Sequence, residues 1–257
     1  MLVLLSCAKT MSAVSKVKVP LTTIPRFQKE AAEIALQMSQ FSVDELERLL
    51  RVNAKIAVEN YKRYQAFHAE TTPELPALLA YTGIVFKRLN PKDFSAEDFG
   101  YAQEHLRLTS FCYGLLRPLD VIRAYRLEGD VVLPELGNQT LFSYWRSRLT
   151  DTFIEDIRSA GGILCYLARD EMKSLFDWKR VESEVRVVTP EFHVWKNGKL
   201  ATIVVYTKMS RGEMTRFILK NKIGNPEELK GFSWEGFEFD ESLSDERKLV
   251  FINGMGE

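Results

Sequence analysis

Apolar residues in the first part of the chain recur at spacings typical of a short strand and then of amphipathic helices. An apolar run at 1–6 predicts a buried strand, and helical spacing over 27–40 predicts a helix. Ser42 and Glu45 have the spacing of a capping box, so a second helix is expected to begin there. Asn53 predicts a break, after which a third helix follows.

The middle of the chain continues with alternating helices and buried strands. A capping pattern predicts a helix over 94–107. The amphipathic pattern over 141–160, closed by the glycines at 161–162, predicts a long helix. A strand is also expected over 108–113. The apolar run at 163–167 predicts a further buried strand, which is followed by polar residues as the first strand is.

The last third is predicted to contain a hairpin, a helix and two short strands. Runs rich in β-branched and aromatic residues over 184–206 flank Asn197-Gly198, a pair that favours a type I′ turn. A helix is expected over 207–222, with short strands near Phe237 and Val250. Since no repeat or linker divides the chain, we expect one domain in which strands and helices mix around a single sheet.

The stretch 113–128 combines leucines with a helix-breaking Pro118 and several arginines. Proline lacks an amide donor and restricts the residue before it, so this stretch is not a regular helix. Its apolar residues favour burial, so the backbone is expected to be fixed against the core while the arginine side chains reach outward. The arginines are Arg117, Arg123 and Arg126. They suit the capture of phosphate or carboxylate, and they equally suit structural ion pairs with Asp120 and Glu128.

The charge of the chain is balanced overall but uneven along its length. Net charge is zero over 257 residues, which gives no overall preference for nucleic acid. Residues 208–222 carry five Lys and Arg against one Glu, whereas residues 226–248 carry eight acids against three bases. A basic segment beside an acidic one is compatible with steering a polyanion to one side. Such segregation also occurs in proteins that bind nothing charged, so it does not decide the function.

Cysteine usage and hydropathy favour an intracellular, membrane-free protein. The three cysteines form neither an even framework nor a metal-ligand spacing, which favours a reducing cytoplasm. No apolar run is long enough to span a bilayer, and the N-terminus shows no signal peptide. The three histidines lie far apart without ligand-like neighbours, so we expect no metal and no cofactor.

The motifs of common catalytic sites are missing from the sequence, including the nucleophile elbow, the P-loop, the Rossmann glycines and the zinc-protease helix. Cys7 lies beside Lys9 at a strand end, where a cation could lower a thiol pKa, but a buried, inert thiol is the favoured interpretation. What remains is a group of cations near predicted strand ends and on one helix face. They are Lys9, Arg117, Arg126, Lys208, Arg211 and Arg216. Together they would bind an anionic ligand without an evident nucleophile, which favours binding over turnover.

With these residues in view, the chain resembles the YaaA peroxide stress protein family over nearly its whole length. The first shared motifs are Ser-x-Ala-Lys-Thr at 6–10, Tyr-Gly-x-Leu-Arg-Pro-Leu-Asp at 113–120 and Tyr-Arg-Leu-Glu at 125–128. The later ones are Tyr-x-Lys-x-x-Arg-Gly-x-Met-x-Arg-Phe-Ile at 206–218 and Pro-Glu-x-Leu-x-Gly-Phe at 226–232. The motifs are specific in combination, whereas no single one would suffice.

The resemblance implies a cytoplasmic bacterial protein that limits oxidative damage by hydrogen peroxide and is linked to keeping unincorporated iron low. It implies a mixed α/β fold in one domain over 1–257, with a bent sheet wrapped by helices and a helix-hairpin-helix element at 51–55. It also implies a positively charged cleft that binds double-stranded or distorted DNA without sequence specificity. The family cations of that cleft correspond here to Lys9, Arg117, Arg126, Lys208, Arg211 and Arg216.

The chain departs from the family pattern at Cys7, where proline is usual, at Gly129, where methionine is usual, and over 166–172. A family-specific activity of that last segment would be altered here. The alternative function is an enzyme acting on a nucleotide or nucleic acid, with the same cations stabilising developing charge and Glu128 or Glu171 as acid or base. A third hypothesis is an iron-handling protein, and the lack of clustered Cys, His and carboxylate ligands argues against it.

Overall fold

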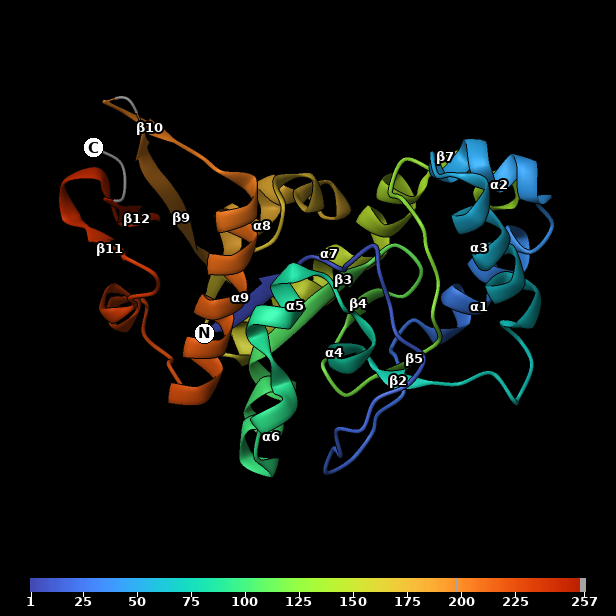
Figure 1. Ribbon diagram of the computed structural model, residues 1–257, viewed down its shortest axis with the longest axis horizontal. Coiled ribbons are helices and arrows are strands. Elements are labelled where there is room, and N and C mark those ends of the chain that lie inside the picture. The colour runs from blue at the N-terminus through green and yellow to red at the C-terminus, as the bar shows by residue number, and fades with distance from the viewer. Residues whose placement is uncertain (197, 255–257) are drawn as a thin grey trace.

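The protein is a mixed α/β structure built around one central sheet (Figure 1). The computed structural model describes residues 1–196 and 198–254. Within these residues the central sheet has eight strands in the order β11-β12-β9-β8-β1-β3-β4, with β10 paired to β9. The strands are β1 (Leu2–Leu5), β3 (Leu106–Ser110), β4 (Gly114–Leu116), β8 (Ile163–Tyr166), β9 (Arg186–Lys196), β10 (Lys199–Ala201), β11 (Phe237–Asp240) and β12 (Lys248–Asn253).

The middle of the sheet is parallel and its edges are antiparallel. Strands β12, β9, β8, β1 and β3 pair in parallel, whereas β4, β10 and β11 each join a neighbour in antiparallel register. All four residues of β1 are buried, as expected for a continuous apolar run covered on both faces of a parallel sheet. The largely parallel sheet and the helices that alternate with its strands confirm the predicted mixed α/β class.

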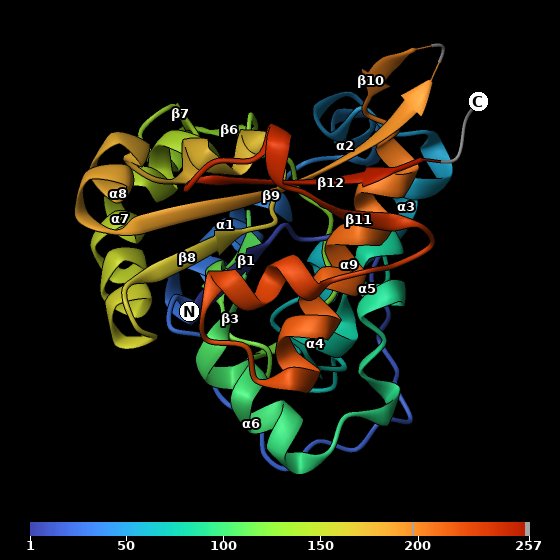
Figure 2. The same ribbon diagram turned by 90° about the vertical axis from the view of Figure 1, so that its left-hand side faces the viewer.

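Helices cover both sides of the sheet. Figure 2 shows α7 and α8 on one side of the strands and α5, α6 and α9 on the other. The helices are α1 (Gln28–Met38), α2 (Val43–Leu50), α3 (Ala54–Ala66), α4 (Ala77–Ala80), α5 (Ile84–Leu89), α6 (Ala96–His105), α7 (Leu141–Ser159), α8 (Trp178–Glu184) and α9 (Val204–Asn221). Within the described part of the chain, none of these helices combines the length and apolarity needed to cross a membrane.

The predicted helix starts are confirmed by their caps. Ser42 and Glu45 form the reciprocal capping box of α2, and the Asn53 side chain accepts a hydrogen bond from the backbone of α3. Helices α2 and α3 pack against each other as a pair. The interpretation of this pair as a phosphate-binding helix-hairpin-helix stays a prediction.

The predicted hairpin over 184–206 is shorter than its sequence pattern indicates. Its second strand, β10, ends at Ala201, and α9 begins at Val204. The β-branched residues at 203–205 favour a strand locally, but here they form the approach to and the first turn of a helix that packs along α5, so tertiary packing overrides the local preference. Asn197, the first residue of the predicted turn, lies outside the described residues.

The order of the strands creates a switch point between β1 and β8. The chain passes from β1 to β3 on one side and from β8 to β9 on the other, although β1 and β8 are adjacent and parallel. Connections that leave two neighbouring strands in opposite directions open a crevice at the carboxyl ends of those strands. The segments that follow β1 and β8 are therefore placed where α/β proteins commonly bind ligands.

Candidate functional site

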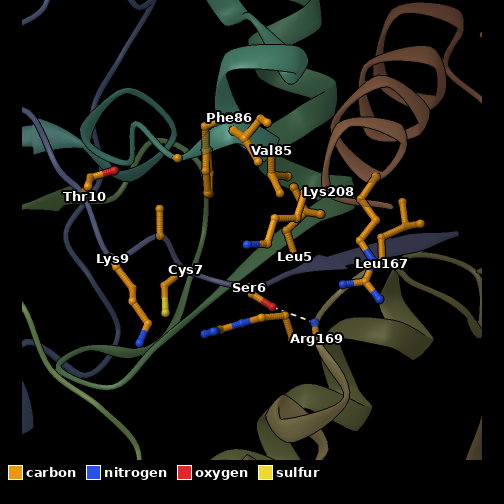
Figure 3. A pocket seen from close by; sticks show the side chains of 14 residues that line it. Leu5, Ser6, Cys7, Lys9, Thr10, Val85, Phe86, Leu167, Arg169 and Lys208 are labelled. Carbon is orange, nitrogen blue, oxygen red and sulfur yellow. Dashed lines mark hydrogen bonds between the residues drawn. The ribbon is translucent and has the colours of Figure 1, made fainter. Parts of the chain in front are cut away.

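A cavity of about 250 Å³ lies at the carboxyl ends of β1 and β8 (Figure 3). Residues 6–10 line it after β1, and Leu167 and Arg169 line it after β8. Residues 83–86 contribute a wall from the start of α5, and Lys208 and Arg211 contribute a second wall from α9. Four segments that are distant in sequence therefore meet at the switch point of the sheet.

One part of the cavity lining is apolar. Its residues are Leu5, Ile84, Val85, Phe86 and Leu167. Leu5 and Leu167 are buried in the core, and Val85 belongs to α5. This helix lies against α9 at Gly212, where an added Cβ would come within 2.3 Å of the Val85 carbonyl oxygen. The close contact of α5 and α9 thus sets the distance between two walls of the cavity.

Cationic side chains form the other part of the lining. They are Lys9, Arg169, Lys208 and Arg211. In Figure 3 the Lys208 ammonium and the Arg169 guanidinium both point toward the side on which Cys7 and Lys9 lie. The backbone N–H of Arg169 donates a 2.7 Å hydrogen bond to Ser6 Oγ, which ties the segment after β8 to the segment after β1.

Two of these cations have carboxylate partners and two have none. Lys9 Nζ lies 2.8 Å from Glu128 Oε1, and Arg169 Nη1 lies 2.9 Å from Glu171 Oε1. Across residues 1–196 and 198–254, neither Lys208 nor Arg211 forms an ion pair. The positive charge on the α9 wall is therefore not held in an ion pair among these residues and is available to an anionic ligand.

Arg211 is the more constrained of the two unpaired cations. Its Nε is shielded from solvent and has no hydrogen-bond partner in the described structure. Burial lowers the pKa of Arg211, while the Tyr166 hydroxyl opposes that effect. A guanidinium remains charged under such a shift, so the buried N–H keeps its capacity to donate to a ligand.

Arg126 and Glu128 extend this cationic group beyond the cavity lining. Arg126 Nη2 lies 3.6 Å from Glu128 Oε1, and its Nη1 donates a 3.5 Å hydrogen bond to the carbonyl oxygen of Lys9. The contact of Lys9 Nζ with the same carboxylate is an ion pair without the direction of a hydrogen bond. Glu128 is 9% exposed and is held between these two cations.

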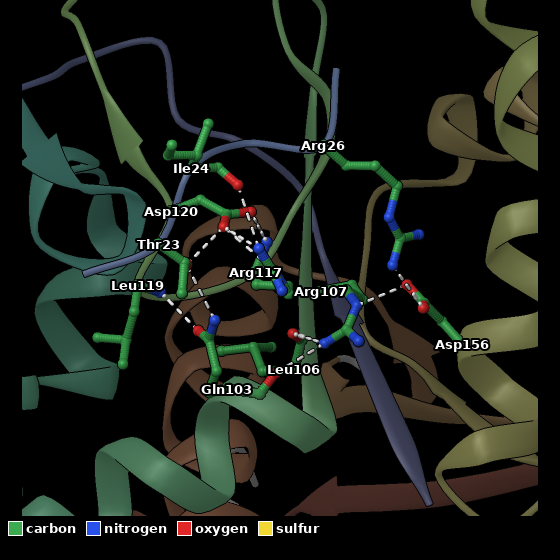
Figure 4. A network of polar contacts seen from close by, with 10 residues as sticks. All are labelled: Thr23, Ile24, Arg26, Gln103, Leu106, Arg107, Arg117, Leu119, Asp120 and Asp156. Carbon is green, nitrogen blue, oxygen red and sulfur yellow. Dashed lines mark hydrogen bonds and ion pairs between the residues drawn. The ribbon is translucent and has the colours of Figure 1, made fainter. Parts of the chain in front are cut away.

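Arg117 lies in a separate polar network (Figure 4). Its Nε and Nη2 donate to Asp120 Oδ1 at 3.1 and 2.9 Å, and Nη2 also donates to the Ile24 carbonyl oxygen at 3.1 Å. Asp120 is buried and also accepts from the Thr23 hydroxyl at 2.6 Å. These contacts tie the stretch after β4 to residues 23–24, so the structural role left open by the sequence describes this arginine.

Arg216 is likewise directed away from the cavity. Its Nη1 donates to Asp93 Oδ1 at 2.9 Å and to the Asn90 carbonyl oxygen at 2.8 Å. These contacts join α9 to the segment after α5. Of the six predicted cations, the structure therefore brings four together and places Arg117 and Arg216 elsewhere. The four are Lys9, Arg126, Lys208 and Arg211.

Arg169 is a lining residue that the sequence analysis did not select. Its signal was its position directly after a buried strand, the same signal that marked Lys9. Its partner Glu171 lies in the 3₁₀ turn Asp170–Leu175 with its side chain 50% exposed. Glu171 therefore balances Arg169 at the edge of the site.

Cys7 lines the cavity but is held as a thiol. Burial raises its pKa to about 11, although the neighbouring Arg169 lowers it in part. Its backbone N–H donates a 3.3 Å hydrogen bond to Thr109 Oγ1. At neutral pH the thiolate is a minor form, which favours the interpretation of Cys7 as an unreactive residue. In the part of the chain that the structure describes, no three His, Cys, Asp or Glu side chains are grouped as metal ligands.

The fold and the site define a mixed α/β protein with a cationic cavity at the switch point of a parallel sheet. The chain belongs to the family of peroxide stress protein YaaA, whose pattern matches residues 1–243.

Several UPF0246 proteins are similar to this chain over their full length. The UPF0246 protein of Bacteroides thetaiotaomicron is 98% identical over 257 residues, which is 100% of both chains. That of Porphyromonas gingivalis is 51% identical over 254 residues, covering 98% of this chain and 99% of the relative. That of Crocosphaera subtropica is 37% identical over 253 residues, covering 98% of this chain and 100% of the relative. The family match over residues 1–243 confirms the predicted family and supports its link to peroxide stress.

Proposed function

We propose that this protein binds DNA in the cytoplasm during peroxide stress and thereby limits oxidative damage. In this proposal, the role is linked to keeping the concentration of unincorporated iron low. The family supports the role in peroxide stress. The observation that carries DNA binding is the pair of unpaired cations on α9, Lys208 and Arg211, beside Lys9 and Arg169. Contacts of this type engage phosphates and do not read bases, so binding is expected to be independent of sequence.

The four assembled cations are assigned different parts of this proposal. Lys208 and Arg211 make the main phosphate contacts because neither forms an ion pair with a carboxylate in the described part of the chain. Lys9 and Arg126 contribute less because they share Glu128. Arg117 and Arg216 support the scaffold through Asp120 and Asp93. The α2–α3 pair carries the exposed Arg51 at its turn, and this guanidinium lies 2.7 Å from Asp130 Oδ2, so it too contributes less to phosphate binding.

The proposal is tested by titrating fluorescent duplex, bulged and single-stranded DNA at several salt concentrations. The variant Lys208→Ala/Arg211→Ala is expected to bind roughly tenfold more weakly, with its salt slope reduced by about 1 for each lost phosphate contact. The control is Lys92→Ala/Lys179→Ala, which removes two exposed lysines that do not line the cavity. The control should bind like the wild type.

Equal binding by the wild type and the α9 variant would refute the proposed contacts, provided that circular dichroism shows both to be folded. The DNA recovered from the titration should be unchanged in length and composition. A new product would instead favour an enzyme that processes nucleic acid at the same cations, and Glu128→Gln would then be expected to abolish the product while binding persists.

A further inference from the structure

We propose that the cavity holds a single nucleotide, with its base against the apolar wall and its phosphate on Lys208 and Arg211. The inference rests on the proposed function because both place a nucleotide phosphate at the same α9 cations. It goes further because it assigns the cavity itself, which binding of a duplex backbone does not require. A duplex is bound through its exposed phosphates, and a flat basic surface is sufficient for that.

The size of the cavity favours one small ligand. Its volume of about 250 Å³ is slightly below the roughly 300–1,000 Å³ of sites for drug-sized molecules. A double helix is far too wide to enter such a space, whereas one planar base with its sugar and phosphate is of a suitable size. The volume of the cavity therefore suits one nucleotide and not a length of duplex backbone.

The cavity lining has an apolar part and a cationic part, which match the base and the phosphate of a nucleotide. Apolar side chains from β1, α5 and the segment after β8 form one wall, and cations form the other. An apolar wall gains nothing from a phosphate, but it gains from covering the face of a planar ring. A small inorganic anion would use only the cationic part of the lining.

Arg211 provides the most specific contact with the phosphate. Its Nε is buried and has no hydrogen-bond partner among residues 1–196 and 198–254, so a ligand that accepts from this N–H satisfies an unmet donor. The planar guanidinium fork matches two phosphate oxygens at once. Lys208 lies three residues earlier on the same helix, so its ammonium is on the same face and adds a second positive charge.

The position of the cavity in the fold supports the same ligand. Ligands of open α/β sheets bind in the crevice at the carboxyl ends of the strands where the connections diverge. The β1 and β8 ends form that crevice here, and the cavity is lined directly by the residues that follow both strands. The nucleotide could come from two sources, a free mononucleotide or a nucleotide rotated out of DNA.

The test uses 2-aminopurine, a fluorescent base whose emission reports stacking. It is presented to the full-length protein as the free 2′-deoxynucleoside 5′-monophosphate and, separately, inside a duplex opposite a mismatch. The variant Val85→Trp fills the cavity from its apolar wall without removing a cation. The matched control is Val58→Trp, which places the same side chain at an exposed position on α3.

Two outcomes support the proposal and identify the source of the nucleotide. If the free nucleotide binds, Val85→Trp should weaken its affinity at least roughly tenfold, whereas Val58→Trp should leave the affinity unchanged. If only the base within DNA changes its emission on binding, Val85→Trp should remove that change while the protein still binds the duplex. Lys208→Ala/Arg211→Ala should weaken both kinds of binding.

The proposal is overturned if no emission changes in either form, or if Val85→Trp responds like the wild type. If duplex binding with the wild-type salt dependence were retained in that case, the proposed DNA binding would still hold and only the cavity assignment would be refuted. Conversely, free nucleotide binding without duplex binding would refute the proposed function and keep the cavity assignment. Should Val85→Trp not fold, 2-aminopurine deoxyriboside and inorganic phosphate are compared on the wild type, and each must bind at least roughly tenfold more weakly than the nucleotide.

Discussion

Replacing Gly212 by alanine tests the packing that forms two walls of the cavity. Gly212 lies inside α9, where it is buried against α5. A Cβ at this position would lie 2.3 Å from the Val85 carbonyl oxygen and 2.7 Å from Arg88 Cβ, whereas ordinary contacts begin at 3.4 Å. The nearest atom belongs to the backbone of α5, so a side-chain rotation cannot relieve the contact. The two helices must therefore separate by about 1 Å.

Two opposing effects determine the change in stability. Alanine is favoured over glycine inside a helix by about 1 kcal/mol. Overpacking of a well-packed contact costs about 1–3 kcal/mol. Since the clash involves backbone on one side, the upper part of that range applies, and Gly212→Ala should lower the free energy of unfolding by about 1–2 kcal/mol. In a chain of this size, each kcal/mol lowers Tm by about 2–4 °C.

The assay is thermal and urea unfolding of Gly212→Ala beside Gly100→Ala. Gly100 is an exposed residue of α6, and a Cβ added there would meet nothing within 4 Å. In this control alanine gains its higher helix propensity without any steric clash, so the free energy of unfolding should rise by about 0.5–1 kcal/mol. If Gly212→Ala is stabilised as much as Gly100→Ala, the close approach of α5 and α9 is not present in solution. Binding at the cavity should also weaken in Gly212→Ala because Val85 is displaced.

Two further outcomes follow from the titratable groups. Burial alone would raise the pKa of Asp98, but hydrogen bonds from Lys220 and Lys222 hold it well below its usual range. Asp98 therefore stabilises the fold above its unfolded pKa of about 4 and loses this effect as pH falls toward its folded pKa. Asp98→Asn should cost about 3 kcal/mol at pH 7 in urea unfolding, and a difference that does not shrink below pH 4 would contradict the assignment. Since the pKa of Cys7 is raised to about 11, its alkylation by iodoacetamide, followed by mass spectrometry, should accelerate about tenfold per pH unit between pH 7 and 9; a plateau near pH 8 would indicate a reactive thiol.

Local patterns in the sequence were sufficient to predict most elements of the fold. Helices α2, α3 and α6 begin after the capping residues Ser42, Asn53 and Ser95. Such starts can be predicted because an N-cap side chain bonds to backbone groups within three residues of it. The apolar runs of β1 and β8 were recognisable for a similar reason, since burial on both faces requires continuous apolar sequence. The start of α9 was misjudged because β-branched residues resemble a strand until packing against α5 is considered.

The candidate site was only partly accessible from the sequence. Lys9, Lys208 and Arg211 were selected by their positions at a strand end and on one helix face, and the structure places them at one cavity. Arg117 and Arg216 have the same residue type and similar surroundings in sequence. Their guanidinium groups are occupied by Asp120 and Asp93, and the second of these pairings joins residues more than a hundred positions apart. A single sequence contains no signal for such a distant partner.

The sequence by itself determined the family, the mixed α/β class and the positions of most helices and buried strands, because these depend on motifs and on interactions between near neighbours in the chain. The tertiary structure alone decided which cations remain free, because that depends on where each carboxylate lies in space. It also decided that the ends of β1 and β8 meet, although Leu5 and Leu167 are separated by most of the chain. The cavity exists because parallel pairing joins distant strands and their connections then diverge.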